Sequence, residues 1–340
     1  MYKRTNLRSI STLILTLFFI LYSECFAQQK IGLVLSGGGA AGVAHVGVLK
    51  ALEERNIPID FIVGTSAGAL VASMYASGYS PKEIEAYVLS EPFQLMVKGE
   101  LESDKKFFFF DDSNTSSMFN IPFSKDSILQ KSIPMSFVNP RYFDFEMLRI
   151  LGRTSAAVKN DFNGLFIPFR CVASDVVRKE SVVFANGNLN EAVRASMTFP
   201  LYLNPIRING VLYFDGGLYD NFPLNAMYEQ FDADFIIGSN VTKNDIKANE
   251  NDFFGMISSM MTTPTNYALP CQEGMIIEPK TEVGTFDFKD VQQAINDGYK
   301  ATLLKLDSLE QFITVRENPD SLARRRAEFR AKVPSIQVSS

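Results

Sequence analysis

The feature that most constrains this chain is the pattern Gly64-Thr65-Ser66-Ala67-Gly68, which lies between two contrasting segments. Before it stands the apolar run Phe61–Val63, typical of a buried strand, and small, helix-forming residues follow it as far as Ala76. A serine on a sharp strand-to-helix turn is called a nucleophile elbow. Gly64 and Gly68 would let neighbouring backbone pass close to that turn. The pattern therefore predicts that Ser66 is a nucleophile at a helix N-terminus, where amides and the helix dipole favour an oxyanion.

A second glycine-rich turn comes earlier in the chain. The continuous apolar run Lys30–Leu35 is typical of a buried parallel strand. It is followed by Ser36-Gly37-Gly38-Gly39-Ala40-Ala41-Gly42 and then by a helix-like stretch, Val43–Arg55. Two strand–helix units within about 50 residues predict an α/β fold with parallel, right-handed connections.

The glycine loop allows three interpretations. Gly37, Gly39 and Gly42 match the spacing of a dinucleotide-binding turn, but that site also needs an acidic residue closing the second strand. Here Asp60 precedes that strand, so a dinucleotide-binding domain is only a remote alternative. The amides of Gly37, Gly38 and Gly39 could instead form an oxyanion hole facing Ser66, because both turns follow neighbouring strands. A merely close-packed turn is the third possibility.

Local patterns predict the remaining elements. We expect helices at 82–89, 141–151, 189–197 and 291–312, and strands at 166–173, 181–184, 211–214 and 234–240. Residues 91–136 look irregular and carry the aromatic clusters 107–110 and 118–123, which could border an acyl-chain path, touch a bilayer or form a core strand. Arginines 324–326 are expected on the solvated face of a short helix.

The sequence Asp215-Gly216-Gly217 follows the predicted strand 211–214. A carboxylate at a strand end can face a site, although a turn aspartate that bonds its own backbone would look the same. A serine–histidine–aspartate triad needs an imidazole, and His45 is the only histidine of the chain. Because it lies in a helix beside a packed turn, we expect it to be structural. Asp215 is then the best-placed base, and Ser66 with Asp215 would form an acyl hydrolase dyad without metal or other cofactor.

Composition limits the partners and the compartment. Among 340 residues, 33 basic and 38 acidic side chains give a formal net charge of −5, which argues against nucleic acid. Residues 1–27 combine a basic start, an apolar run and a small residue, as in a cleaved signal peptide; a membrane anchor is the alternative. We therefore expect an exported protein cleaved after Ala27. Cys171 is expected to be a buried free thiol, and a disulfide with Cys271 cannot be derived from the sequence.

Together these motifs resemble the patatin-like phospholipases. The likeness covers about residues 30–240 and extends to His45-x-Gly47-Val48-Leu49, to Arg194-Ala195-Ser196-Met197 and to Asn221-x-Pro223. It implies a three-layer α/β sandwich with a mainly parallel central sheet flanked by helices. It also implies a Ser66–Asp215 dyad, an oxyanion hole in the 37–39 loop, and hydrolysis of lipid or phospholipid esters at a membrane surface.

The resemblance extends to domain organisation, with one departure in the glycine loop. The chain is similar to a bacterial exported type in which the hydrolase precedes a periplasmic domain and an outer-membrane barrel. We expect a signal peptide at 1–27, a hydrolase domain at 28–312, and a linker helix with a possible further domain start at 313–340. Relatives commonly carry Lys or Arg where this chain has Ala41, so a charge near a lipid phosphate is missing. A non-catalytic module binding a membrane or a partner is the alternative function.

Overall fold

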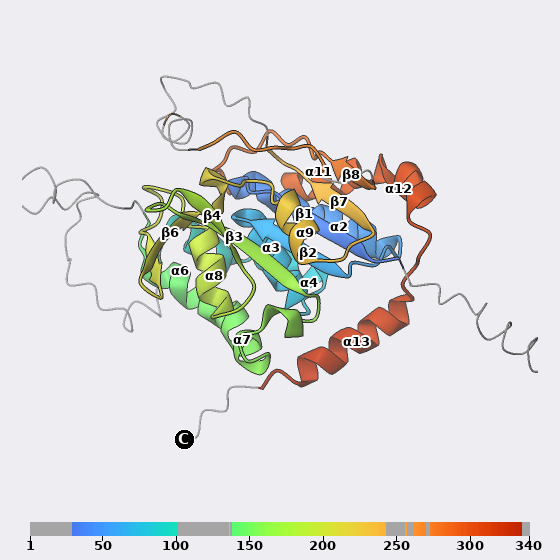
Figure 1. Ribbon diagram of the computed structural model, residues 1–340, viewed down its shortest axis with the longest axis horizontal. Coiled ribbons are helices and arrows are strands. Elements are labelled where there is room, and N and C mark those ends of the chain that lie inside the picture. Colours follow the sequence, from blue (N-terminus) through green and yellow to red (C-terminus); the bar gives the residue numbers. More distant parts are fainter. Residues whose placement is uncertain are drawn as a thin grey trace, which may run out of the picture.

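A single eight-stranded sheet forms the centre of the computed structural model, which describes residues 29–100, 136, 138–242, 256, 262–269 and 273–334. Its strand order is β5-β6-β3-β2-β1-β7-β8, with β4 paired to β3 off this path (Figure 1). Strands β1, β2, β3, β7 and β8 run parallel, while β4 and β6 are antiparallel to β3. The predicted mainly parallel α/β sheet is therefore confirmed.

The strands are β1 (Ile31–Leu35), β2 (Phe61–Thr65), β3 (Phe169–Asp175), β4 (Glu180–Phe184), β5 (Ile206–Ile208), β6 (Val211–Asp215), β7 (Phe235–Ser239) and β8 (Gly274–Ile277). The α-helices are α2 (Ala44–Glu54), α3 (Ala67–Ala76), α4 (Pro81–Val88), α5 (Glu91–Lys98), α6 (Pro140–Met147), α7 (Arg153–Ala157), α8 (Leu189–Ser196), α9 (Leu224–Gln230), α11 (Val291–Leu303), α12 (Leu306–Phe312) and α13 (Pro319–Ala331). Short 3₁₀ turns are η1 (Gly39–Val43), η3 (Phe162–Gly164) and η4 (Gly216–Leu218), and a π-turn, η2 (Leu148–Gly152), joins α6 to α7.

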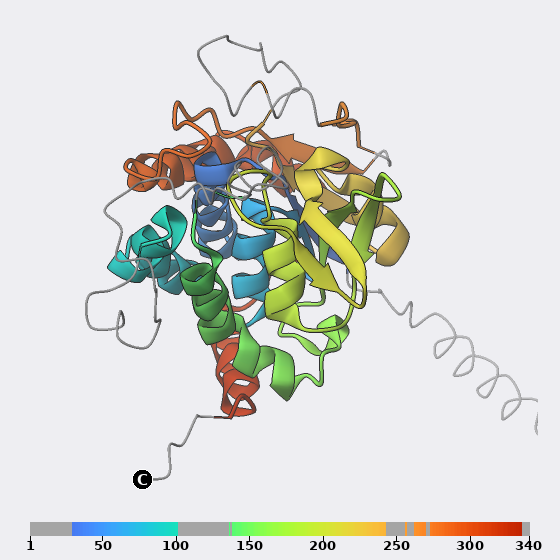
Figure 2. The same ribbon diagram turned by 90° about the vertical axis from the view of Figure 1, so that its left-hand side faces the viewer.

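Helices cover both faces of the sheet, which makes the fold a three-layer sandwich (Figures 1 and 2). Successive strand residues point to opposite faces. Thus Leu33 and Ile62 join the core beneath α2 and α3, whereas Val34 and Val63 join the smaller core beneath α9. Burial on both faces explains why these strands are continuous apolar runs without alternation.

Two helix predictions need correction. The sequence predicts irregular structure from Glu91, but α5 begins there. Phe93, Met96 and Val97 are buried, and Gly99, with φ of 70°, ends the helix in the left-handed conformation. The single helix predicted at 291–312 is instead two helices, α11 and α12. The chain turns at residues 304–305, and this turn brings Leu306 and Leu309 into the core.

Two short strands were not predicted. Strand β5 forms a hairpin with β6 through Asn209 and Gly210, whose φ angles of 49° and 86° suit a tight two-residue turn. Strand β8 adds a parallel edge next to β7. An Asn-Gly pair is a recognisable hairpin signal, whereas the four residues of β8 are too few for a clear period.

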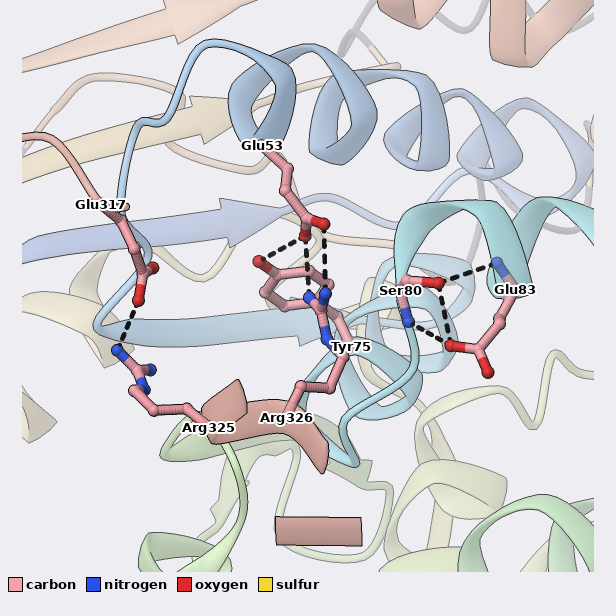
Figure 3. Close-up of polar contacts among 7 residues, drawn as sticks. All are labelled: Glu53, Tyr75, Ser80, Glu83, Glu317, Arg325 and Arg326. Atoms are coloured by element: carbon pink, nitrogen blue, oxygen red, sulfur yellow. Dashed lines mark hydrogen bonds and ion pairs between the residues drawn. The ribbon is translucent and has the colours of Figure 1, made fainter. Parts of the chain in front are cut away.

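The prediction that the arginines of α13 form a solvated face is wrong for Arg326, which is buried. Its guanidinium donates to both carboxylate oxygens of Glu53, at 3.1 and 2.8 Å, and lies over the ring of Tyr75 (Figure 3). It also lies over the ring of Phe166. Tyr75, near the end of α3, donates to the same carboxylate at 3.2 Å. A neighbouring pair joins Arg325 to Glu317 at 2.6 Å. Helix α13 is therefore packed against the rest of the fold, beside the end of α3, the helix that follows Ser66.

Several sequence predictions fall outside the described residues. They concern the signal peptide at 1–27, the aromatic clusters at 107–110 and 118–123, and Cys271. Cys171 is described, and it is a free, fully buried thiol as predicted. Across the described ranges, no helix has both the length and the apolarity that a membrane span requires.

The Arg326–Glu53 pair predicts how α13 contributes to stability. Replacing Arg326 by Met should lower the free energy of unfolding by about 1–3 kcal/mol, because a partly buried carboxylate loses its charged donor. Thermal unfolding followed by circular dichroism would measure the loss. Arg324→Met, on the exposed side of the same helix, is the matched control. Equal melting temperatures for the two variants would contradict the packing role of Arg326.

Candidate active site

Ser66 stands between β2 and α3 on the predicted elbow. Its backbone angles, φ of 53° and ψ of −125°, lie in a region that few non-glycine residues adopt. A Cβ on Gly64 would lie 2.6 Å from the carbonyl carbon of Gly68, and a Cβ on Gly68 would lie 2.4 Å from the carbonyl oxygen of Ser36. Both glycines are therefore required by close backbone contacts, and the turn exposes part of the Ser66 side chain.

Asp215 meets Ser66 from the end of β6. The hydroxyl of Ser66 donates to Oδ2 of Asp215 at 2.7 Å. The other carboxylate oxygen, Oδ1, accepts the amide of Gly217 at 2.8 Å. Both sequence interpretations of this aspartate therefore hold at once: it closes its own turn and it faces the serine.

Burial changes the acidity of this carboxyl group. The side chain of Asp215 is 4% exposed, and desolvation raises its pKa to about 7, against the opposing effects of the bonds from Ser66 and Gly217. An aspartate in water, with a pKa of about 3.9, would be a weak base for a hydroxyl. A value near neutrality is suited to general-base catalysis.

His45 is structural, as the sequence predicted. It is fully buried, and its Nε2 lies 2.8 Å from the carbonyl oxygen of Ser36 while Nδ1 lies 2.8 Å from Oγ of Ser239. Because a carbonyl only accepts, Nε2 carries the proton and Nδ1 accepts from the Ser239 hydroxyl. Burial lowers the pKa of His45 to about 4, so the ring is neutral and joins β7 to the glycine loop. Neither nitrogen is left for Ser66.

The glycine loop differs from its predicted role at one residue. The amide of Gly37 donates to the carbonyl of Asn221 at 2.9 Å, so it is engaged and cannot serve an oxyanion. Gly38 and Gly39 line the same cavity as Ser66. Gly39, with φ of 57°, begins η1, where the first amides of a helical turn have no partner within the turn. These two residues, and not all three, are the candidates for an oxyanion hole.

The remaining motif glycines allow loops to meet at the site. A Cβ on Gly42 would lie 2.5 Å from that of Ala67, and one on Gly216 would lie 2.2 Å from the carbonyl oxygen of Val172. A Cβ on Gly217 would crowd the side chain of Asn221 at 2.7 Å. These glycines thus act through packing between the two turns, the aspartate loop and β3.

A cavity of about 350 Å³ opens at Ser66, and its lining includes two groups of residues of unlike chemistry. One, the apolar wall, consists of Leu70, Val71, Val88, Phe93, Val97 and Phe143. The other, the hydroxyl wall, consists of Asn221, Thr242, Thr262, Thr263 and Thr265. Within it the Asn221 side-chain amide donates to Thr242 at 2.7 Å, and the Asn221 backbone amide donates to Thr265. The serine hydroxyl therefore lies where an amphipathic ester could reach it.

Sequence reasoning gave no role to the residues that accept the backbone amides of Ser66 and Asp215. The backbone amide of Ser66 donates to Oγ of Ser196 at 2.8 Å, and that of Asp215 donates to the carbonyl of Thr198 at 2.8 Å. Ser196 lies in the Arg-Ala-Ser-Met motif that carried part of the resemblance, which was its only signal. As for metals, no group of three or more ligating side chains gathers anywhere in the described ranges.

Comparison with known proteins supports the resemblance. The lysophospholipase NTE1 of Candida albicans is 29% identical over 210 residues, which are 62% of this chain and 13% of that protein. The lysophospholipase NTE1 of Cryptococcus neoformans is 32% identical over 209 residues, again 62% of this chain but 11% of that protein. The chain thus spans only a small part of the length of these relatives.

Similarity to solved structures is weaker. VipD from Legionella pneumophila aligns with a TM-score of 0.44 and 17% identity, over 83% of this chain and 67% of that one. The family described as "Patatin-like phospholipase" matches residues 33–228, which include the glycine loop, the elbow and Asp215. The chain therefore belongs to the patatin-like phospholipase family.

Proposed function

We propose that this protein is a lipid acyl hydrolase that cleaves carboxylic esters with Ser66 as nucleophile and Asp215 as base. The observation that carries the proposal is the 2.7 Å hydrogen bond from the Ser66 hydroxyl to the buried Asp215 carboxylate at a cavity with an apolar wall. The family and the lysophospholipase relatives support the same class of reaction.

In the proposed acylation, Asp215 accepts the Ser66 proton while Oγ attacks the ester carbonyl carbon. The carbonyl oxygen becomes an oxyanion, which the amides of Gly38 and Gly39 and the N-terminal end of α3 would stabilise. The tetrahedral intermediate then collapses, the bond to the alcohol breaks, and the alcohol takes the proton from Asp215. The products of this half-reaction are a free alcohol and an acyl-serine.

Deacylation would repeat the sequence with water. Asp215 accepts a proton from the water as it attacks the acyl carbon, and the same amides stabilise the second oxyanion. Collapse releases the fatty acid, and Ser66 regains its proton from Asp215. The cycle balances without a metal or an organic cofactor.

The two walls of the cavity suggest how the ester lies. The apolar wall suits an acyl chain, whereas the hydroxyl wall suits the alcohol part of the lipid. In the described residues, no Lys or Arg lines this cavity. The lysophospholipase relatives favour esters with one acyl chain over those with two. The missing basic residue at Ala41 bears on the alcohol part instead, because it leaves a lipid phosphate without a favourable charge at that position.

The location of this activity stays a prediction from the sequence. We propose export on the basis of residues 1–27, and a periplasmic or outer-membrane setting on the resemblance to exported patatin-like proteins. A lipid surface is the proposed site of action. A continuation into a periplasmic domain and a barrel belongs to the same proposal.

The dyad predicts a particular pattern of mutant activities. Ser66→Ala and Asp215→Asn should each lose nearly all ester hydrolysis, and the double variant should be little worse than either, because the two residues act as one unit. His45→Gln should cost less than the about 10²–10⁴-fold loss of a general base, since its ring nitrogens bond Ser36 and Ser239 and not the serine. Steady-state kinetics on a soluble ester would measure all four.

Circular dichroism and labelling provide the controls for these variants. Each must keep the wild-type spectrum, and a fluorophosphonate should label the wild type but not Ser66→Ala. A folded His45→Gln as inactive as Ser66→Ala, beside an active Asp215→Asn, would leave the mechanism untenable. A folded wild type that neither hydrolyses esters nor reacts with the probe would favour the non-catalytic module.

The raised pKa of Asp215 predicts the pH profile. The carboxylate form is the base, so kcat/KM should be constant above about pH 7 and fall tenfold per pH unit below it. His45, whose pKa is lowered to about 4, should not contribute to this limb. Hydrolysis measured from pH 4 to 9, with stability checked at each pH, tests the assignment. A midpoint near 4, the ordinary value for an aspartate, would contradict it.

The apolar wall predicts selectivity for chain length. Val97→Phe should fill part of the cavity and lower kcat/KM for a long-chain monoacyl ester by about tenfold or more. Hydrolysis of an acetyl ester, which needs little of this wall, should change little. Val177→Phe, at a position 77% exposed, is the control. Equal losses of kcat/KM on both substrates would show that the apolar wall does not bind the acyl chain.

A further inference from the structure

The end of helix α8 holds both members of the dyad by their main chains. Ser196, the last residue of α8, accepts the amide of Ser66 through its hydroxyl at 2.8 Å. Two residues later, the carbonyl of Thr198 accepts the amide of Asp215 at 2.8 Å. Ser196 and Thr198 are both fully buried. Because Ser66 follows β2 and Asp215 ends β6, this short segment bridges the two strand ends that carry the dyad.

Arg194 holds the segment in turn. Its Nη1 donates to Oγ1 of Thr198, and that hydroxyl donates back to the carbonyl of Arg194 at 2.8 Å. The remaining donors reach Asp144 at 2.6 Å and the carbonyl of Asn204 at 3.1 Å. The Arg194 side chain is 5% exposed, so its planar fork is fixed by partners on three sides.

The elbow explains why such support is needed. Ser66 adopts strained backbone angles, which persist only where the surroundings over-determine them. Without Ser196, its amide would lose its partner in the interior, and the strained turn could relax. Relaxation would move Oγ away from Asp215, and small displacements of reacting groups reduce rates strongly.

We propose that Arg194, Ser196 and Thr198 are positioning residues that fix the separation between the Ser66 hydroxyl and the Asp215 carboxylate. The inference rests on the proposed function, because it concerns the same dyad. None of the three residues acts on the substrate. Arg194 fixes Thr198, Thr198 fixes the backbone of Asp215, and Ser196 fixes the backbone of Ser66.

This role has a consequence for the pH profile. The hydrogen bond from Ser66 lowers the pKa of Asp215, in opposition to burial. If Ser66 drifts away, that contribution is lost and the midpoint of the pH–rate profile moves above its wild-type position. A residue that merely stabilised the fold would lower the amount of active protein without moving the midpoint.

The test compares, in the full chain, two buried serines: Ser196, the last residue of α8, and Ser155, a residue of α7 that contacts the first residue of α8. Ser196→Ala removes the acceptor of the Ser66 amide, and Ser155→Ala removes the acceptor of the Leu189 amide, a bond of 3.0 Å. Ser155 is 1% exposed, so both changes delete one buried hydroxyl. For Ser196→Ala we expect kcat on a short-chain ester to fall by about tenfold or more with KM nearly unchanged, and the pH midpoint to rise. Ser155→Ala should have the kcat and the pH midpoint of the wild type.

A second pair keeps the inference testable if Ser196→Ala does not fold. Arg194→Lys retains a charge toward Asp144 but loses the fork to Thr198 and Asn204, whereas Arg170→Lys alters a buried arginine at the start of β3. Only Arg194→Lys should lower kcat and raise the midpoint.

The outcomes separate the inference from the proposed function. If the wild type is active and Ser196→Ala has the same kcat and pH midpoint as Ser155→Ala, the inference alone is overturned. If Ser196→Ala does not fold, the same kcat and pH midpoint in Arg194→Lys and Arg170→Lys would overturn it. A folded wild type that neither hydrolyses esters nor reacts with a fluorophosphonate would overturn the proposed function and this inference together.

Discussion

The hydrogen bond between Ser66 and Asp215 is the constraint around which the rest of the site is arranged. Its two residues are 149 positions apart, and Asp215, a residue only 4% exposed, must keep its carboxylate beside a hydroxyl. Within the described part of the chain, no cation is among the groups that shift its pKa. Burial alone would favour the protonated acid, and two hydrogen bonds oppose that tendency. The balance leaves the pKa near 7, where the group can both take and return a proton. The fold therefore tolerates a costly buried charge at the point where the proposed reaction requires one.

The sheet brings the site together because the carboxyl ends of its parallel strands meet at one edge. The glycine loop follows β1 and the elbow follows β2, so the two turns are neighbours across one ladder of hydrogen bonds. Asp215 reaches the same edge from β6, which is antiparallel to β3, with its residue paired to Ala173. Because Thr65 pairs with Val172, the neighbour of Ala173, this register sets Asp215 level with Ser66 although it comes so late in the chain. His45 completes the edge by tying the glycine loop to the end of β7.

Local patterns predicted the parts of this site that depend on local geometry. The elbow, the structural histidine and the position of Asp215 follow from strand ends, glycines and the presence of a single imidazole, all of which are visible in the sequence. The engaged amide of Gly37 could not be predicted, because its partner Asn221 is distant in sequence. The buried face of α13 was missed for the same reason: Arg326 meets Glu53 across 273 residues, and an arginine looks solvated until its partner is known.

The contacts that support Ser66 and Asp215 are the part of the site that the sequence reveals least. Ser196 and Thr198 act on Ser66 and Asp215 through backbone amides, which carry no residue-specific signature. Yet these contacts resist two unfavourable features at once, the strained backbone of Ser66 and the desolvated carboxylate of Asp215. Relief of either would stabilise the chain locally and separate the proposed nucleophile from its base. Local stability and the proposed activity are therefore opposed at this site, and the end of α8 is where the packing favours activity.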